Sequence, residues 1–241
     1  MKINTEKLFL RDLFLYDVSS CHYNILKGLG VDLAGIDPKD KTSRNIKIGM
    51  LMKDNPNLTS MLRTITESTI NEYLTRNEID ESQVVIRQYD GLITTKPMTG
   101  TDEFLPLELR GIIQTFLIAY EKRNMFLALY QNGEISIKGI PQRYEMIDEI
   151  FAKILRINFL SKWAIFESLQ KIREEVFTSK SSLLYYIPED KSEGTVQLKG
   201  YGPTRISKTM ARVMDAGDID RDYYWKFYFE GFAKSIVKEF V

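Results

Sequence analysis

The chain has 241 residues, of which 44% are hydrophobic and 27% are charged. These fractions are typical of a folded globular protein and exclude disorder as its main state. The 33 basic and 33 acidic residues balance. The chain therefore lacks the overall basic excess that is typical of nucleic-acid-binding proteins, and any contact with phosphates must come from a local basic surface.

The chain has one cysteine, Cys21, and one histidine, His22. A single cysteine excludes an internal disulfide, and the two residues together exclude a zinc cluster built from cysteine and histidine. We therefore expect a reducing, cytosol-like compartment. No apolar run approaches the roughly 20 residues that cross a bilayer, and acidic residues interrupt the apolar N-terminal stretch. We expect neither a membrane partner nor a secretory signal.

The N-terminal segments indicate a strand and then a helix. Residues 8–20 are rich in aromatic and aliphatic side chains and predict a buried strand that ends near Asp17. Residues 22–30 predict a helix that Gly28 and Gly30 stop.

A longer helical region and a hairpin follow. Residues 43–77 have a mostly helical pattern that is interrupted at residues 54–56, and Ser60 is the predicted start of the second helix. Residues 82–97 place two β-branched runs on either side of residues 89–91, which predicts a tight β-hairpin.

The second half of the chain becomes increasingly helical. We expect a helix over 107–119, a hairpin over 126–140 that turns at Asn132 and Gly133, a helical region over 144–175, strands over 183–188 and 195–200, and a last helix over 223–240. This order of elements predicts a mixed α+β fold.

Asp17 and Asp90 occupy two complementary settings, the end of a strand and the tip of a hairpin. Each acid alone also fits an ordinary turn residue. Two carboxylates, completed by substrate phosphates, are enough to hold two Mg²⁺ ions about 4 Å apart, which is the arrangement that nucleotidyl transfer uses. The pair predicts such a two-ion site, with Mn²⁺ as a substitute.

Residues 17–26, DVSSCHYNIL, resemble motif A of family B DNA polymerases, D-x-x-S-L-Y-P-S-I. Asp17 matches the metal-binding aspartate, and Ser20 and Ile25 match the serine and the last isoleucine. The resemblance implies that Asp17 and Val18 bind metal and that nucleotide-binding residues follow directly. These residues are Ser19, Ser20, Cys21 and His22. The family has a tyrosine at the position of His22 that excludes a 2′-hydroxyl, so the choice between deoxy- and ribonucleotides stays open.

Residues 87–93, RQYDGLI, are similar to motif C, Y-x-D-T-D-S. Asp90 matches the second aspartate, which is the metal ligand, while Gln88 and Gly91 replace the first aspartate and the serine. The segment is also similar to the family A motif Q-V-H-D-E, which keeps Asp90 as the ligand.

Polymerases also need cations on a fingers helix to neutralise the triphosphate. Arg44 and Lys47 lie three residues apart and share one helical face, and Lys53 follows. The family motif K-x-x-x-N-S-x-Y-G is not present. A solvated basic helix face is the alternative interpretation.

Downstream basic residues resemble those with which the family holds the primer and template. Lys122 and Arg123 lie near the K-K-x-Y motif, and Lys138, Gly139 and Arg143 match a following K-G-hydrophobic-x-x-R pattern.

Further along, residues 219–224 resemble the I-D-x-x-Y-Y segment of the thumb. We expect the aromatic residues at 223–229 to form packed core. Basic residues of this region would contact duplex phosphates: Lys199, Arg205, Lys208 and Arg212.

The resemblance covers almost the whole chain and implies an α+β polymerase palm with an antiparallel sheet and helices, short helical fingers and a C-terminal, mostly helical thumb. The implied domains are palm over 1–30, reduced fingers over 31–80, palm over 81–145 and thumb over 146–241. Family B enzymes normally carry an N-terminal proofreading exonuclease, and we expect this chain to lack one, because the stretch before Asp17 is too short for it. We therefore expect a small viral or phage system, in the host cytoplasm, with a second polypeptide that carries the exonuclease or the remaining polymerase parts.

The leading hypothesis is a magnesium-dependent, template-directed polymerase core or subunit that extends a primer 3′ end with nucleoside triphosphates. One alternative is a non-catalytic, polymerase-like subunit that binds DNA or a partner protein, which the missing first aspartate of motif C favours. Another is a fragment of a single-subunit RNA polymerase, which His22 permits.

Overall fold

The computed structural model describes residues 2–99, 104–140, 145–178, 182–188 and 191–241. The chain divides into two compact units, which comprise residues 1–6 with 12–113 and residues 7–11 with 114–241. Two long strands, β2 (Phe9–Val18) and β5 (Leu107–Ala119), contribute to both units. The predicted α+β class with an antiparallel sheet is confirmed.

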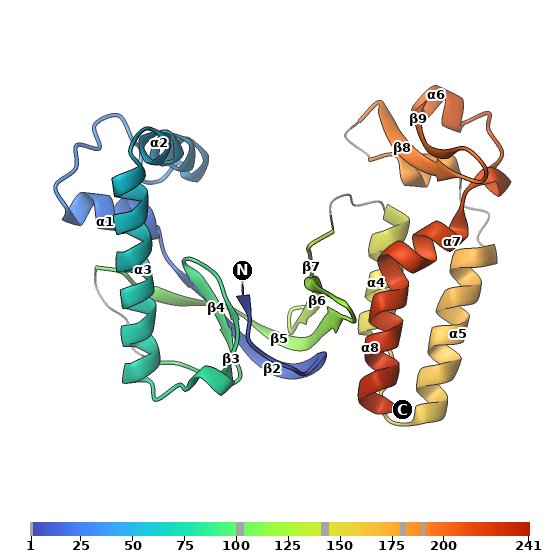
Figure 1. Ribbon diagram of the computed structural model, residues 1–241, viewed down its shortest axis with the longest axis horizontal. Coiled ribbons are helices and arrows are strands. Elements are labelled where there is room, and N and C mark those ends of the chain that lie inside the picture. The colour runs from blue at the N-terminus through green and yellow to red at the C-terminus, as the bar shows by residue number, and fades with distance from the viewer. Residues whose placement is uncertain (1, 100–103, 141–144, 179–181, 189–190) are drawn as a thin grey trace. The chain divides into compact units, whose positions relative to one another are not determined.

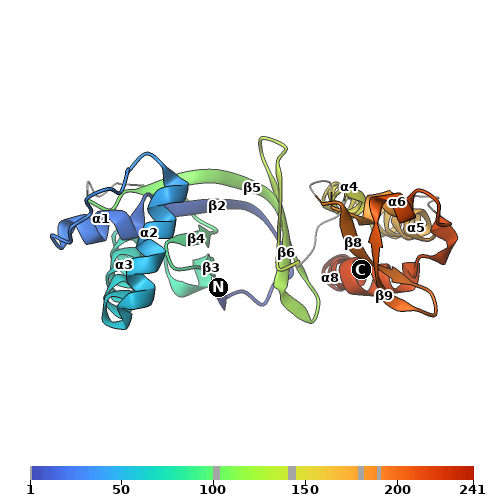
Figure 2. The ribbon, with the colours of Figure 1, turned by 90° about the horizontal axis from the view of Figure 1, so that it is seen from above.

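The first unit combines a sheet with helices (Figure 1). Its strands follow the order β1-β3-β4-β2-β5, and β2 and β5 lie side by side (Figure 2). The other elements of the unit are β1 (Lys2–Ile3), α1 (Cys21–Gly28), α2 (Lys41–Asp54), α3 (Pro56–Arg76), a 3-10 turn (Glu81–Gln83), β3 (Val84–Arg87) and β4 (Gly91–Thr94).

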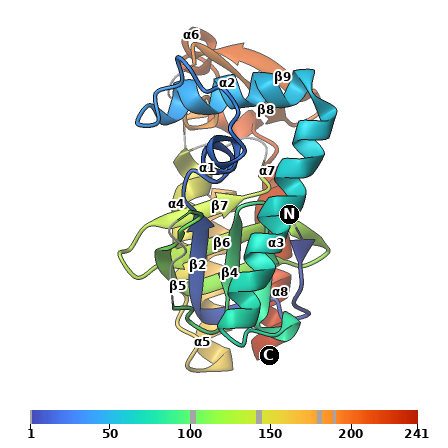
Figure 3. The same cartoon turned by 90° about the vertical axis from the view of Figure 1, so that its left-hand side faces the viewer.

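Antiparallel pairing of β2 with β4 sets the register of the first unit (Figure 3). Phe14 lies opposite Thr94, and Asp17 lies opposite Gly91 at the other end of the ladder. Tyr16 and Val18 point into the core, where they pack with residues of α1 and α3 such as Ile25 and Ile70. Because side chains alternate along a strand, Asp17 is on the opposite face from these two core residues.

The second unit joins an antiparallel hairpin to a group of helices (Figure 1). Its further elements are β6 (Lys122–Tyr130), β7 (Ile135–Lys138), α4 (Glu145–Leu155), α5 (Lys162–Thr178), η2 (Leu183–Tyr186), β8 (Glu193–Leu198), β9 (Gly202–Ser207), α6 (Lys208–Ala211), a 3-10 turn (Ala216–Asp218), α7 (Arg221–Tyr224), a π-helical segment (Trp225–Phe229) and α8 (Glu230–Phe240). Tyr224, Tyr228 and Phe229 are buried, so the predicted aromatic segment contributes to the core.

The predicted helix over 107–119 is wrong, because these residues form strand β5. The apolar spacing of the segment fits a helix, but its β-branched residues also suit a strand. Residues Thr115 to Ala119 are all buried, and β5 has hydrogen-bonded neighbours on both sides, β2 and β6. Tertiary context therefore decided the structure of this segment.

Two further boundaries differ from the prediction. Helix α3 begins at Pro56 rather than at Ser60, because the Asn55 side chain accepts a hydrogen bond from the Leu58 N–H and caps the helix. The predicted strand over 183–188 is a 3-10 turn that Ser182 caps. The predicted hairpins over 82–97 and 126–140 and the strand over 195–200 are confirmed.

Within the residues that the structure describes, none of the helices combines the length and the apolar character needed to cross a bilayer.

The position of Gly139, which follows β7, predicts that an added side chain there would lower the stability of the second unit. The φ of Gly139 is +78°, and a Cβ there would lie 2.7 Å from the carbonyl carbon of Asn124. Gly133, with φ +85°, has open space around it. We expect Gly139→Ala to destabilise the second unit by about 3 kcal/mol or more, and Gly133→Ala by only about 1 kcal/mol, the cost of the left-handed backbone alone.

Both tryptophans, Trp163 and Trp225, belong to the second unit. Urea unfolding followed by tryptophan fluorescence therefore reports on this unit. Equal losses of stability in the two alanine variants would contradict the expected clash at Gly139.

Candidate metal and nucleotide site

Asp17 and Asp90 come together where strand β2 meets the turn between β3 and β4. The Val18 N–H donates to the Asp90 carbonyl at 2.7 Å, and Asp17 lies opposite Gly91. A Cβ at Gly91 would lie 3.3 Å from the Tyr16 carbonyl oxygen and 3.7 Å from Asp17 Oδ1. Glycine at this position therefore lets the turn lie close against the end of β2.

The environment of Asp17 disfavours its charge. Burial raises the pKa of the Asp17 carboxyl, and the neighbouring Asp90 carboxylate raises that pKa further. Arg110 and, more weakly, Lys41 oppose the shift by stabilising the carboxylate. The two acids therefore form a partly buried pair of like charges, an arrangement that is enriched at functional sites.

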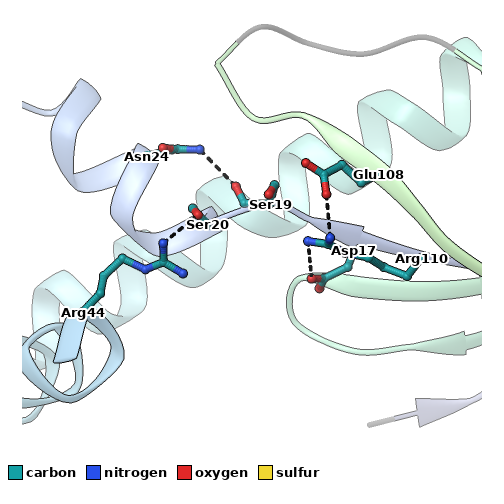
Figure 4. A network of polar contacts seen from close by, with 7 residues as sticks. All are labelled: Asp17, Ser19, Ser20, Asn24, Arg44, Glu108 and Arg110. Atoms are coloured by element: carbon teal, nitrogen blue, oxygen red, sulfur yellow. Dashed lines mark hydrogen bonds and ion pairs between the residues drawn. The ribbon is translucent and has the colours of Figure 1, made fainter. Parts of the chain in front are cut away.

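Arg110 is a site residue that the sequence analysis missed. Its Nη2 lies 3.5 Å from Asp17 Oδ2, and its Nη1 lies 2.7 Å from Glu108 Oε2 (Figure 4). Glu108 and Arg110 are two residues apart on β5, so they share one face of the strand. The incorrect helix prediction separated them, because residues two apart on a helix point in different directions.

The start of helix α1 adds groups that attract anions. Ser20 precedes the helix with φ 49° and ψ 35°, and its side chain makes no capping hydrogen bond. The first N–H groups of a helix have no intrahelical partner, and they carry the positive end of the helix dipole. Arg44 from α2 donates to the Ser20 Oγ at 3.0 Å (Figure 4). It also donates to the Pro38 carbonyl at 2.7 Å.

These groups surround one cavity of about 550 Å³. The predicted site residues that line it are Asp17, Val18, Ser19, Ser20, Cys21, His22, Arg44 and Asp90. Lys41, Asn45 and Arg110 line it as well, without having been predicted. Lys47 does not line it, because its ammonium group donates instead to the Gly35 carbonyl.

The Cys21 thiol is not activated as a nucleophile, and burial keeps the His22 imidazole neutral. Burial raises the pKa of the Cys21 thiol to about 11, and its sulfur lies 3.2 Å from the Thr66 hydroxyl. Burial also lowers the pKa of His22, although Asp90 acts in the opposite direction. The His22 Nε2 is buried and has no hydrogen-bond partner among the described residues. The cavity therefore suits binding through carboxylates, backbone groups and cations.

The donor set fits magnesium completed by substrate oxygens. The described residues include no group of three or more histidine, cysteine, aspartate or glutamate side chains arranged to hold a metal. Two carboxylates with a neighbouring backbone carbonyl are hard oxygen ligands, which magnesium prefers together with phosphates and water. Asp17, Asp90 and the Val18 carbonyl can supply them.

The predicted nucleic-acid-binding residues belong to the second unit. Lys122 donates to the Phe227 carbonyl at 2.9 Å and lies over its ring, so its ammonium group is held within the unit. Arg205 pairs with Glu193, and Lys199 donates to the Gly217 carbonyl at 3.2 Å. Lys138 is exposed and Arg123 is partly buried, whereas Arg143 lies outside the described residues.

The chain matches no family model and no curated protein sequence. Among solved structures, the family B DNA polymerase from the hyperthermophilic archaeon Pyrobaculum calidifontis is similar, with a TM-score of 0.51 and 12% sequence identity. The likeness covers 98% of this chain and 46% of that polymerase, so the chain spans less than half of the polymerase's length. At this identity, the likeness shows a polymerase-like fold.

The acid pair generates a prediction about proton binding. We expect Asp90→Asn to lower the pKa of Asp17, because it removes the neighbouring charge, yet to leave that pKa above its ordinary value, because burial remains. Arg110→Gln should raise it. NMR titration of ¹³C-labelled aspartate carboxyls measures both effects.

A raised pKa means that the folded chain binds the Asp17 proton more tightly than the unfolded chain. The contribution of Asp17 to stability is therefore largest below its ordinary pKa and declines as the pH rises through the raised value. An Asp17 pKa that does not respond to Asp90→Asn would show that the two carboxylates are not neighbours.

Proposed function

We propose that the chain is the catalytic core, or a catalytic subunit, of a magnesium-dependent polymerase that extends a primer 3′ end on a template. The observation that carries this proposal is the cavity of the first unit. On one wall it has the acid pair Asp17 and Asp90, and on another it has the open N-terminus of α1 with Arg44. A metal-bound triphosphate needs both kinds of group side by side.

Each part of the cavity has a distinct role in this proposal. Asp17, Asp90 and the Val18 carbonyl hold the metal, while backbone N–H groups from Ser20 to His22, with Arg44, hold the phosphates. Bound magnesium supplies charge neutralisation at the phosphates and lowers the pKa of the attacking hydroxyl. His22 borders the nucleotide and contributes to the choice of sugar.

The polymerase-like fold supports the remaining assignments. Helices α2 and α3 serve as short fingers, the sheet as palm, and the region from residue 146 onward as thumb. In this proposal, exposed or partly exposed basic residues of the second unit contact the primer and template: Arg123, Lys138, Lys199 and Arg205, with Lys122 and Arg143 as further candidates. In this proposal, a second polypeptide that carries the exonuclease or the remaining polymerase parts is a further partner.

A second candidate is a non-catalytic, polymerase-like subunit that binds DNA or a partner protein. The ion pair that joins Arg110 to Asp17 favours it, because this pair occupies a carboxylate that a metal would need. Duplex binding that persists without magnesium, together with no incorporation of any nucleotide, would select this function.

Primer extension with labelled nucleotides tests the catalytic proposal. We expect Asp17→Ala and Asp90→Ala each to lower the rate of incorporation by about a thousand-fold, because either change removes a metal ligand. Asp54→Asn is the matched control, since Asp54 is exposed at the end of α2 and does not line the cavity. Full activity in both alanine variants would refute the catalytic role.

Comparison of ribo- with deoxynucleotides separates an RNA polymerase from a DNA polymerase.

Arg44 and Lys47 provide a test of the phosphate site. We expect Arg44→Gln to weaken nucleoside triphosphate binding on the order of ten-fold, because a charge-assisted contact is lost. Lys47→Gln should change it little, because Lys47 bonds to the Gly35 carbonyl. Isothermal titration calorimetry with magnesium present measures both. Equal losses in the two variants would instead assign Lys47 to the phosphate site.

A further inference from the structure

The Arg110 guanidinium is shared between two carboxylates through different nitrogens (Figure 4). Nη1 lies 2.7 Å from Glu108, within hydrogen-bonding distance, while Nη2 lies 3.5 Å from Asp17. The side chains of Arg110, Asp17 and Glu108 are 43%, 38% and 42% exposed. Solvent therefore screens both pairs, and the longer one is easily exchanged.

Asp17 needs a positive neighbour, because Asp90 lies beside it in the same cavity. Within the described part of the chain, Arg110 is the cation that forms an ion pair with Asp17. A divalent cation bound between the two aspartates would need the same carboxylate. Guanidinium and metal therefore compete for Asp17, whereas Glu108 can keep the guanidinium in either state.

We propose that Arg110 is a positioning residue with two states. In the metal-free protein its guanidinium pairs with both Asp17 and Glu108. When a divalent cation binds Asp17, the guanidinium leaves Asp17 and pairs with Glu108 alone. This inference rests on the proposed function only in requiring that Asp17 and Asp90 bind a divalent cation. It assigns to Arg110 and Glu108 the control of how tightly that cation binds.

Glu108 is the carboxylate with which Arg110 pairs after it leaves Asp17. A planar guanidinium can pair with one carboxylate through two parallel hydrogen bonds, which makes Glu108 a complete partner for Arg110 on its own. The two residues lie on the same face of β5, so Arg110 can leave Asp17 without any change in the backbone. In the metal-free cavity, the Asp17 carboxylate thus keeps Arg110 as its cationic partner. In the metal-bound cavity, no guanidinium competes with the metal for Asp17.

Mn²⁺ binding, measured by the electron paramagnetic resonance signal of the free ion, tests this role without any activity assay. The full chain is titrated without nucleotide or nucleic acid. We expect Arg110→Gln and Arg110→Ala to bind Mn²⁺ roughly two- to five-fold more tightly than the unchanged chain, which corresponds to the removal of a solvent-exposed competitor. Circular dichroism verifies that both variants are folded.

Lys41→Gln is the matched control for a general effect of charge. Lys41 lines the same cavity and, among the described contacts, makes no ion pair with Asp17. We expect this variant to change Mn²⁺ affinity less than Arg110→Gln does. Equal gains in the two variants would overturn the specific role of Arg110, as would an unchanged or weaker affinity in the Arg110 variants.

A double-mutant cycle tests the role of Glu108. We expect Glu108→Gln alone to weaken Mn²⁺ binding about two-fold, because Arg110 then has only Asp17 as a partner, and to have no effect when Arg110 is already glutamine. An effect of the same size in both backgrounds would mean that Glu108 acts on the cation directly, which would overturn the exchange.

Asp17→Asn separates this inference from the proposed function. If Asp17→Asn abolishes Mn²⁺ binding but Arg110→Gln does not tighten it, the proposed metal site is supported and only the inference about Arg110 is overturned. Mn²⁺ binding that is unchanged by both Asp17→Asn and Asp90→Asn would overturn the metal site of the proposed function and the inference with it.

Discussion

The antiparallel ladder between β2 and β4 brings together two side chains that repel each other. Asp17 and Asp90 are 73 positions apart in the chain, yet the register and the hydrogen bond from Val18 to Asp90 leave their carboxylates at one end of the ladder. The repulsion is tolerated because core residues hold the strands: Tyr16 and Val18 on β2, and Leu92 on β4, are buried. The apolar side chains of the sheet therefore enforce an electrostatically unfavourable arrangement, which is typical of functional sites.

The phosphate-binding half of the cavity depends on a second unfavourable feature. Ser20 has a left-handed backbone, which is uncommon for a residue with a side chain, and this conformation starts α1 directly after β2. A buried arginine, Arg44, then joins Ser20 to the loop before α2. The hydrogen bond from Arg44 of α2 to Ser20 thus helps to hold the start of α1, and its backbone N–H groups, beside the acid pair.

Local patterns predicted the strand end and the hairpin tip that carry Asp17 and Asp90, because strand ends and hairpin turns leave clear local signals. The resemblance to motifs A and C singled out the two acids, and Val18 to His22 with them. The failures had a different cause. Residues 107–119 fit both a helix and a strand, and only pairing with distant strands decided between them. Arg110 was missed for this reason, since its position beside Asp17 exists only in the strand. Lys47 was placed at the phosphates by helical spacing alone, which does not reveal that the preceding loop folds back to accept its ammonium group.

The buried thiol of Cys21 has a practical consequence. The chain has no other cysteine, and at neutral pH a thiol with a pKa of about 11 is almost entirely protonated and reacts slowly with maleimides. A cysteine introduced on the surface of either unit would then be labelled selectively, without removal of the native residue. Pairs of such labels would allow the distance between the two units to be followed in solution by energy transfer.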